Sequence, residues 1–578
     1  MSGVAPAPGW IISRPADLCF FVGTPLVCLF VLLLASHYYA SADIALFVLA
    51  FFAVGHHLPG LMRAYGEREL FARYRARFLV TPILVALLVG WSVFNGHLGF
   101  FIFLALWDLW HFFMQHFGFM RIYEMKCRRP SRISARLDWL LSAAWLGYVV
   151  VASPHYLINF LERCHRYGFG LYAWIEPEWV VRFGTAVGYF ALAITFVYAA
   201  NVVRERRQGL PVVWPKLAIT AITVGTSYYA YIVLQDILLG YAIIAMAHDI
   251  QYYAIVWIYN HGVLKRSEAL GASFFRYLFR DGRFRIVLFY LGLILAYGGV
   301  EVVARSTQNY LIYDLVKVLI ATSAFLHYYY DGFMWKVRKK EIRQNLAAGV
   351  EGTGEAPWRS RWRAWLELRQ QRWPAFPYLF ETGKQLVYFG VPIVFLAWTD
   401  VSYSQSEVET REYLVRLAPS LAAAQDGLGV AYTRAGRLEE AVAAHQRAIA
   451  IAPKWAPAHT HLGIALSVRG QREEAISQHL EAIRLDPRLA QARHNLGVEY
   501  FQAGQTENAR AAFAAAIDLD PSYAQAHQAL GQVYLRQGRQ REAAAEAAKA
   551  IELQQSSRRR RMGQSAMPWA TGTPIGEN

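Results

Sequence analysis

The sequence is poor in cysteine and in charged residues. Its 578 residues include four cysteines, and Asp, Glu, Lys and Arg together make up 17% of the chain. Cys19, Cys28, Cys127 and Cys164 show no CxxC spacing and no disulfide framework, which excludes a disulfide-stapled scaffold. A glycine-rich nucleotide-binding loop is also missing from the pattern. Arg14 precedes a long apolar run without a small-residue cleavage site, so we expect this run to be retained as a membrane span.

The sequence is rich in apolar residues, because hydrophobic residues make up 55% of the chain. A transmembrane helix needs about 20 mostly apolar residues. Eleven segments meet this description, near 18–37, 43–59, 78–94, 98–117, 138–157, 179–200, 217–234, 237–258, 286–303, 311–331 and 385–400. We therefore predict an all-α fold in which residues 1–400 form a polytopic transmembrane bundle of about eleven spans.

The net charge of +16 lies mostly in short loops between the apolar runs. The basic loops follow every second span, at Arg63–Arg77, Lys126–Arg136, Arg204–Arg207, Lys265–Arg283 and 336–384. Positive loops mark the cytoplasmic side. This pattern predicts the plasma (inner) membrane, a cytoplasmic N-terminus and an extracytoplasmic C-terminal part. It also predicts contact with membrane lipid and no nucleic-acid partner. Within 336–384, Arg and Trp alternate from Trp358 to Trp373, which is typical of an interfacial helix.

From about Ser420 the chain repeats every 34 residues. Several registers keep this spacing, namely Pro419/Pro453/Pro487/Pro521, Gly429/Gly463/Gly497/Gly531, Gly436/Gly470/Gly504/Gly538, Ala441/Ala475/Ala509/Ala543 and Ala448/Ala482/Ala516/Ala550. Small residues allow two helices to cross closely, and Pro ends the second helix of each unit. Residues 420–553 resemble four tetratricopeptide (TPR) repeats. The resemblance implies an α-solenoid that binds a protein or peptide partner in its concave groove. Residues 401–419 are predicted to form a linker and capping helix, and 554–578 a disordered basic tail.

Histidines gather at the inner ends of the predicted spans two, four, eight and ten. Asp108 lies three residues before His111, Asp249 adjoins His248, and Asp331 lies four after His327. Residues three or four apart share one helix face. Ionisable residues inside a bilayer are costly and usually functional. We predict a metal site among His56, His57, His111, His116, His248, His327, Asp108, Asp249 and Asp331, with the carboxylates as ligands or as groups that orient an imidazole.

Helix geometry limits this set. His111 and His116 point about 140° apart on an ideal helix, so both ligate only if the helix end unwinds or two metal ions lie between helices. His261 lies about 20 Å from His248 along a continuous helix and is predicted to be peripheral.

Imidazole with carboxylate and without thiolate suits iron, and also zinc, manganese or copper. Through His111–x4–His116 and the clustering, the membrane part resembles the histidine-box membrane metalloenzymes, which include desaturases, hydroxylases and carotenoid-cleaving oxygenases. It departs from the family because the HxxHH boxes are absent and the doublet His56–His57 lacks the preceding histidine. The resemblance implies a di-iron site and oxidation of a lipid-soluble substrate.

Two other functions fit the same organisation. Some lipid-linked glycosyltransferases join a polytopic domain to TPRs, but they carry acidic catalytic residues in a sizeable first outward loop, which here is only Ser41–Asp43. A non-catalytic scaffold or transporter is the other alternative, with the histidines as proton relays or structural groups. In every case the loop charges place the repeats and the histidines on opposite sides of the bilayer.

Overall fold

The computed structural model describes residues 9–97, 99–127, 131–166, 175–234, 236–266, 271–279, 284–306, 310–335, 369, 373–402 and 406–564. Most of the predicted interfacial loop 336–384 and most of Trp358–Trp373 lie outside these residues, as does the end of the predicted tail. The described part is all-helical and contains no β-strand, only an isolated bridge between Glu67 and Gly271.

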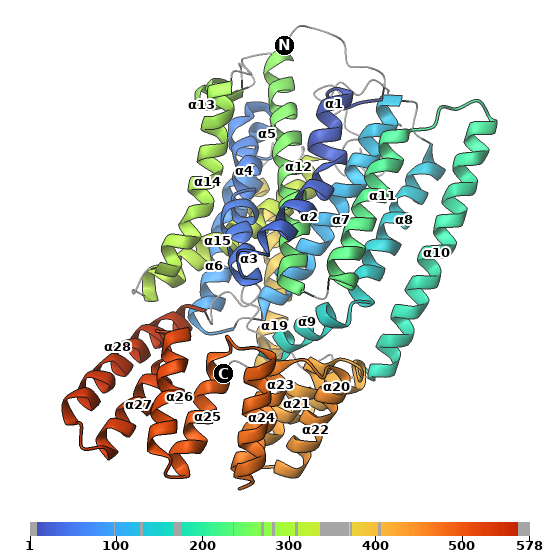
Figure 1. Cartoon of the computed structure of the whole chain (residues 1–578). Helices are drawn as coiled ribbons and strands as arrows, with labels where there is room; N and C mark the ends of the chain where they lie inside the picture. The colour runs from blue at the N-terminus through green and yellow to red at the C-terminus, as the bar shows by residue number, and fades with distance from the viewer. Residues whose placement is uncertain are drawn as a thin grey trace. The chain divides into compact units, whose positions relative to one another are not determined.

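The chain divides into two compact units. The bundle unit comprises Met1–Gly170, Arg182–Tyr403 and Met567–Gly572, and the repeat unit comprises Leu171–Val181, Ser404–Ala566 and Thr573–Asn578. Each unit is described separately below, with the helix labels of Figure 1.

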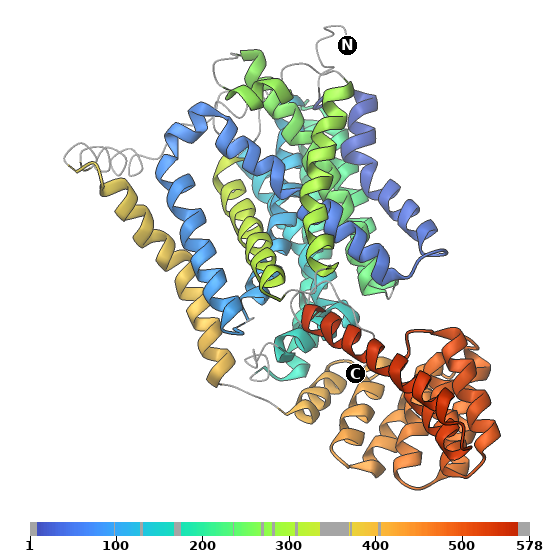
Figure 2. The same ribbon diagram turned by 90° about the vertical axis from the view of Figure 1, so that its left-hand side faces the viewer.

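The bundle unit is built of long helices that run alongside one another and of shorter helical segments (Figures 1 and 2). They are α1 (Arg14–Asp17), α2 (Thr24–Ala35), α3 (Ser41–Val48), α4 (His57–Gly66), α5 (Arg68–Arg73), α6 (Arg75–Phe94), α7 (Phe100–Cys127), α8 (Arg132–Val151), α9 (Pro154–Arg166), α10 (Pro177–Arg207), α11 (Trp214–Tyr228), α12 (Ile237–Arg266), α13 (Ser273–Phe279), α14 (Phe284–Ser306), α15 (Tyr310–Met334), α18 (Phe376–Gln385) and α19 (Val391–Ser402). Four π-helical segments interrupt them, η1 (Leu18–Val22), η2 (Leu49–Val54), η4 (Tyr229–Val233) and η6 (Leu386–Gly390).

Helix α12 is the main packing element of the bundle. It contacts α2, α3, α4, α11 and α13 as well as η2 and η4. A core cluster of the bundle unit includes Tyr252, Val256, Tyr259 and Val263 of this helix, all buried. Helix α12 therefore brings its polar residues into the centre of the unit.

The structure contains fewer apolar spans than the eleven predicted. By length and composition, the described residues include five helices that qualify, Ser41–Gly66, Arg75–Phe94, Pro177–Arg207, Leu311–Met334 and Phe376–Trp398. The count rises to seven if two bent pairs are each one span, Arg14–Val22 with Thr24–Ala35 (52°) and Arg132–Val151 with Pro154–His165 (73°). Helices α7 and α12 are long, but their interior faces carry buried polar residues, including Glu124, His248, Asp249 and Asn260. These side chains lower the mean hydropathy of both helices.

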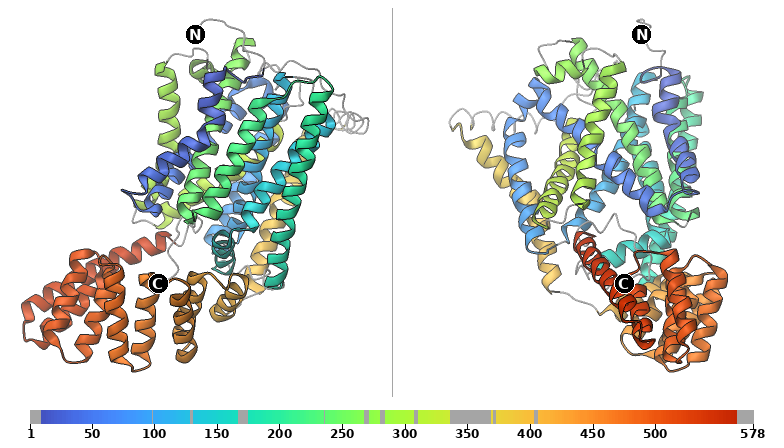
Figure 3. Two further views of the ribbon diagram at one scale, coloured as in Figure 1. Left: turned by 45° about the vertical axis from the view of Figure 1, so that its right-hand side comes forward. Right: turned by 60° about the vertical axis from the view of Figure 1, so that its left-hand side comes forward.

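The repeat unit is a solenoid of helix pairs, seen from two sides in Figure 3. After α20 (Glu407–Leu417) come the pairs α21/α22 (Ala422–Arg434, Leu438–Ile451), α23/α24 (Ala456–Val468, Arg472–Leu485), α25/α26 (Ala490–Gln502, Thr506–Leu519) and α27/α28 (Ala524–Arg536, Gln540–Gln564). Each of the four predicted repeats is one such pair. Helix α28 extends past residue 553, the predicted end of the array.

One glycine register explains how the chain turns within each pair. Gly436, Gly470, Gly504 and Gly538 follow the first helix of each pair with φ of +75°, +90°, +77° and +76°. Glycine adopts this left-handed conformation without a Cβ clash, so it ends the helix and allows the chain to turn.

Candidate metal centre

Four segments of the bundle unit bring histidines to one buried place. The π-helix η2 ends just before Gly55, and the next residues, His56 and His57, begin α4. A π-turn adds a residue to a helical turn and often marks a functional site. Here it is held by α14, because Gly298 has no room for a Cβ against the carbonyl of Ala50. The other histidines come from α7, α12 and α15.

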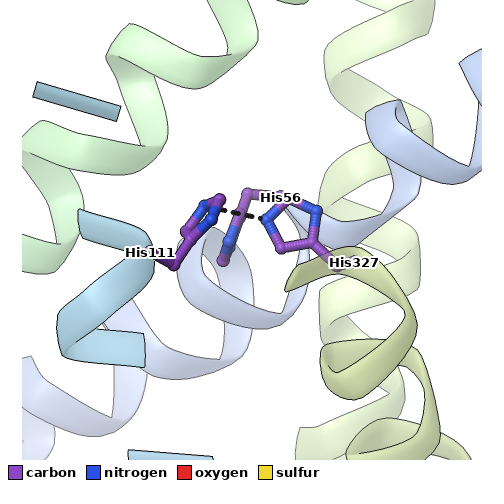
Figure 4. A group of neighbouring side chains, drawn as sticks. All are labelled: His56, His111 and His327. Carbon is purple, nitrogen blue, oxygen red and sulfur yellow. Dashed lines mark hydrogen bonds between the residues drawn. The ribbon is translucent and has the colours of Figure 1, made fainter. Parts of the chain in front are cut away.

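The first group of possible ligands comprises His56, His111 and His327. One ligand atom from each lies within 4.8 Å of the others, and all three residues are buried. The Nε2 atoms of His111 and His327 are 3.2 Å apart. Figure 4 shows the three imidazoles converging from different helices. Asp331 lies next to this group, with its Oδ2 3.8 Å from His327 Nε2 and 3.9 Å from His111 Nε2.

The second group comprises His56, His248 and Asp249, and it meets the same distance limit. His56 Nδ1 lies 3.1 Å from Asp249 Oδ1. The rings of His56 and His248 are 5.6 Å apart between centroids. Since His56 belongs to both groups, the two sets of ligands are adjacent.

Several buried polar atoms in these groups have no hydrogen-bond partner among the described residues. They include Nε2 of His56, both ring nitrogens of His248, Nδ1 of His327 and Oδ2 of Asp249. A buried polar atom without a partner is costly and requires an explanation. A cation would satisfy imidazole nitrogens and carboxylate oxygens together, so the donor set fits a metal ion.

Other side chains fix the orientation of the carboxylates. Tyr252 Oη and Trp335 Nε1 each donate to Asp331 Oδ1 at 3.0 Å. Tyr328 Oη donates to Asp108 Oδ1 at 2.8 Å. Hydrogen bonds of this kind around a metal site hold its ligands in place.

His57 and Asp108 are neighbours of the two groups and belong to neither. His57 Nδ1 is 2.7 Å from Ser323 Oγ, and its ring centroid is 4.7 Å from that of His56. Asp108 is held by Tyr328, as described above.

His116 and His261 lie outside both groups. Helix α7 continues unbroken past His111 and His116, so these two histidines point in different directions. His116 is buried, and its Nε2 has no hydrogen-bond partner among the described residues. His261 Nδ1 lies 2.9 Å from the carbonyl oxygen of Phe279, in agreement with its predicted peripheral place.

The sequence prediction misassigned Arg63. The sequence predicts that Arg63 lies in the basic loop after the second span, but in the structure its side chain is fully buried. Its guanidinium lies 3.8 Å from the centre of the Tyr259 ring and 4.2 Å from that of Trp335, and it pairs with Glu67. The i,i+4 spacing of Arg63 and Glu67 was the available signal. Because Trp335 also bonds Asp331, Arg63 supports the wall beside the histidines.

An apolar cavity of about 450 Å³ adjoins the histidines. Its lining residues come mainly from α7, α8, α12 and α15, and His56, His57, His248, Asp108 and Asp249 lie on its wall. A cavity of this size holds a small molecule. Tyr328 is part of this wall, whereas Tyr252 donates a hydrogen bond to Asp331.

Comparisons with known proteins concern the helical repeats. Family models described as TPR repeat and tetratricopeptide repeat match residues 497–538, 421–452 and 524–557. The C-terminal region therefore contains tetratricopeptide repeats, as the 34-residue period predicted. All three segments lie outside the helices that carry the candidate metal ligands. A search of curated protein sequences finds no match to the chain.

Several solved structures are similar to a part of this chain. MamA from Desulfovibrio magneticus RS-1 is 25% identical over 26% of this chain and 84% of its own, with a TM-score of 0.23. YrrB, described as a TPR protein with an unusual peptide-binding site, is 21% identical over 34% of this chain and 95% of its own, with a TM-score of 0.22. The first TPR of Spaghetti (RPAP3), bound to an HSP90 peptide, is 19% identical over 20% of this chain and 93% of its own, with a TM-score of 0.20.

Proposed function

We propose that the bundle unit is a membrane-embedded oxidoreductase with a two-metal, iron-containing centre that acts on a lipid-soluble substrate. The observation that carries this proposal is the pair of adjacent ligand groups that share His56. Each group is buried. Because His56 is common to both, one ion would take His56, His248 and Asp249, and the other His111 and His327 with Asp331.

Iron is the metal that the donor chemistry favours. The second group has two imidazoles and one carboxylate, the composition of the facial triad in non-haem iron oxygenases. The first group offers three imidazoles, with the Asp331 carboxylate nearby. No cysteine joins either group among the described residues.

The surrounding residues have separate tasks in this proposal. The ions would be held by His56, His111, His248, His327 and Asp249. Asp331 would be a further ligand or would orient a neighbouring imidazole. When bound, iron supplies a redox couple through which dioxygen can oxidise a C–H bond. The apolar cavity would place the substrate beside the histidines and exclude water.

The surface of the bundle unit supports its placement in a membrane. Large apolar side chains stand exposed on several outer helices, among them Phe30 (70%), Leu87 (65%), Phe196 (75%) and Val387 (66%). Exposed apolar surface of this extent is unusual for a protein in water. The loop charges favour a cytoplasmic N-terminus, histidines near the inner face and repeats outside.

The repeats are a protein-interaction module, and we propose that they bind a protein or peptide partner outside the cytoplasm. With the metal centre near the inner face, the partner and the substrate would lie on opposite sides of the bilayer. The array would then serve assembly or localisation rather than delivery of substrate.

Elemental analysis of the detergent-purified full chain tests the metal centre. We expect about two equivalents of iron, with loss in the His111→Ala and His327→Ala variants. His116→Ala is the matched control, because it removes a buried histidine of the same helix outside both groups and should retain the metal. Correctly folded protein without metal would contradict the proposal. It would favour the alternative of a non-catalytic scaffold or transporter in which the histidines are proton relays.

A further inference from the structure

The cavity beside the histidines has a second, chemically different end. Arg163 and Tyr156 of α9 line it, together with Tyr231 of η4 and Ile237 at the start of α12. A smaller adjoining hollow is lined by Arg163, Tyr156 and Ile237 as well, and by Phe101 at the start of α7. Arg163 therefore lies near the level at which α7 and α12 begin.

The distance between the two ends follows from helix geometry. Ile237 and His248 are on one continuous helix, and at 1.5 Å per residue they are separated by about 16 Å along its axis. On α7, Phe101 and His111 are separated by about 15 Å. Between these levels the wall is mainly apolar, with Leu104, Leu109, Ile244 and Ala245 among its residues.

The charges on the wall give the cavity a direction. Arg163 is the one basic side chain apart from histidine among the described lining residues, whereas Asp108 and Asp249 lie toward the histidines. An anionic group is attracted to Arg163, while at the other end the imidazoles and Asp249 would be occupied by the metal ions of the proposed centre. A guanidinium forms strong charge-assisted hydrogen bonds with carboxylate or phosphate oxygens.

The cavity also has an entrance on the apolar side of the bundle unit. Leu106 and Trp110 of α7 and Trp139 of α8 line it, and these three side chains are themselves exposed. A molecule dissolved in lipid would reach the cavity here without crossing water.

We infer that the cavity binds a single-chain anionic amphiphile, with its head group at Arg163 and its chain extended toward the histidines. This inference rests on the proposed function, which makes the histidine end of the cavity a metal centre. It names the substrate class that the oxidoreductase would take. A carboxylate and a phosphate head offer Arg163 the same chemistry, so the experiment has an arm for each.

Binding to the iron-loaded full chain tests the inference, with palmitate, hexadecyl phosphate and hexadecanol displacing a fluorescent fatty acid. We expect one or both anionic probes to bind at least about tenfold more tightly than the alcohol, since the alcohol lacks the charge-assisted hydrogen bond to the guanidinium. Arg163→Ala should remove this difference and Arg163→Lys should retain part of it. Whichever anion binds better identifies the head group.

A second pair of variants tests the position of the chain. Gly147 lines the cavity, and a Cβ added there meets no atom within 4 Å, so Gly147→Phe fills the cavity without a local clash. It should abolish binding of all three probes. Gly292→Phe is the control, because Gly292 has equally open space on α14 and is not a lining residue.

Iron content measured on the same samples separates the two proposals. Equal affinity for the acid, the phosphate and the alcohol, or full binding by Arg163→Ala, with iron retained, would overturn the substrate class and leave the metal centre intact. Anion binding that depends on Arg163 in protein without iron would overturn the oxidoreductase and leave a lipid-binding site.

Discussion

One position of the repeat array holds a ring against a glycine in three successive repeats. His445, His479 and Phe513 occupy the same register, and each ring lies over Gly429, Gly463 or Gly497. A Cβ added to Gly463 would come within 2.5 Å of His479 Cε1. The array therefore needs a ring of this size at the position, and Phe513 indicates that an apolar ring suffices.

His479 makes the stability of the array depend on pH. Burial, with the nearby charge of His494, lowers the pKa of His479 from 6.5 to about 4. Below pH 6.5 the unfolded chain binds a proton that the folded chain takes up only near pH 4, so stability is full above pH 6.5 and falls between these values. The loss is on the order of 3 kcal/mol at 1.36 kcal/mol per pKa unit.

The His479→Phe variant isolates this effect. We expect its α23/α24 pair to be as stable as the parent at pH 7.5 and to lose much less stability on acidification. Hydrogen–deuterium exchange of residues 456–485 in the full chain, corrected for intrinsic rates, measures both. An unchanged pH slope in His479→Phe would show that other groups control acid stability.

The sequence predicted the residue types of the candidate site better than their arrangement. His111, Asp249 and His327 were recognisable because charged and imidazole side chains are rare in apolar segments. Their convergence depends on how α4, α7, α12 and α15 pack, which no local spacing encodes. Two supporting residues were missed for related reasons. Ser323 contacts His57, which is distant in the sequence. Trp335 donates to Asp331 from one helical turn beyond the predicted span 311–331.

At the scale of helices, a buried ionic network joins α7, α8 and α11. Lys216 Nζ lies 2.9 Å from Glu124 Oε2 and 3.0 Å from Asp138 Oδ1, and Arg121 pairs with both carboxylates. Two cations and two anions balance each other, with Lys216, Glu124 and Asp138 all buried. This network connects the three helices about 20 Å along α7 from His111.

Removing one charge from this network should destabilise the bundle unit. Lys216→Met leaves buried carboxylates with insufficient positive charge, which costs about 3–5 kcal/mol. The melting temperature and yield of the purified protein should fall together. Lys549→Met is the control, because Lys549 forms an exposed pair with Glu552 and its loss costs about 1 kcal/mol or less. Equal effects of the two changes would contradict a structural role for the network.

Helices were predictable to different degrees in the two units. The 34-residue period placed the repeat helices because each repeat uses the same small residues and the same turn glycine. In the bundle unit, the π-segment η2 has no such signature, although it positions His56. The predicted count of eleven spans was too high. Helices such as α7 and α12 bury polar faces, so their mean hydropathy is lower than that of a typical membrane span.

At the scale of the whole molecule, the charge pattern makes a prediction about sidedness. A periplasmic alkaline phosphatase fused after Asn578 should be active, and a cytoplasmic fluorescent reporter at the same place should be dark, because the charge pattern of the loops favours a cytoplasmic N-terminus and an extracytoplasmic C-terminal part. A matched pair of fusions after Arg207, in a basic loop, should give the reverse result. A C-terminal fusion active only in the cytoplasm would reverse the orientation proposed for the repeats.

The polar interiors of α7 and α12 have a consequence for biosynthesis. A segment with histidines and carboxylates in its middle partitions poorly into lipid as it leaves the ribosome. In the membrane placement proposed above, such a segment would stay at the insertion machinery until neighbouring segments cover its polar face. For α7, the Lys216 of α11 that neutralises Glu124 is made only after α8, α9 and α10. The first half of the bundle would therefore be released into lipid late and as a group, and chains truncated before α11 would be early targets of membrane proteases.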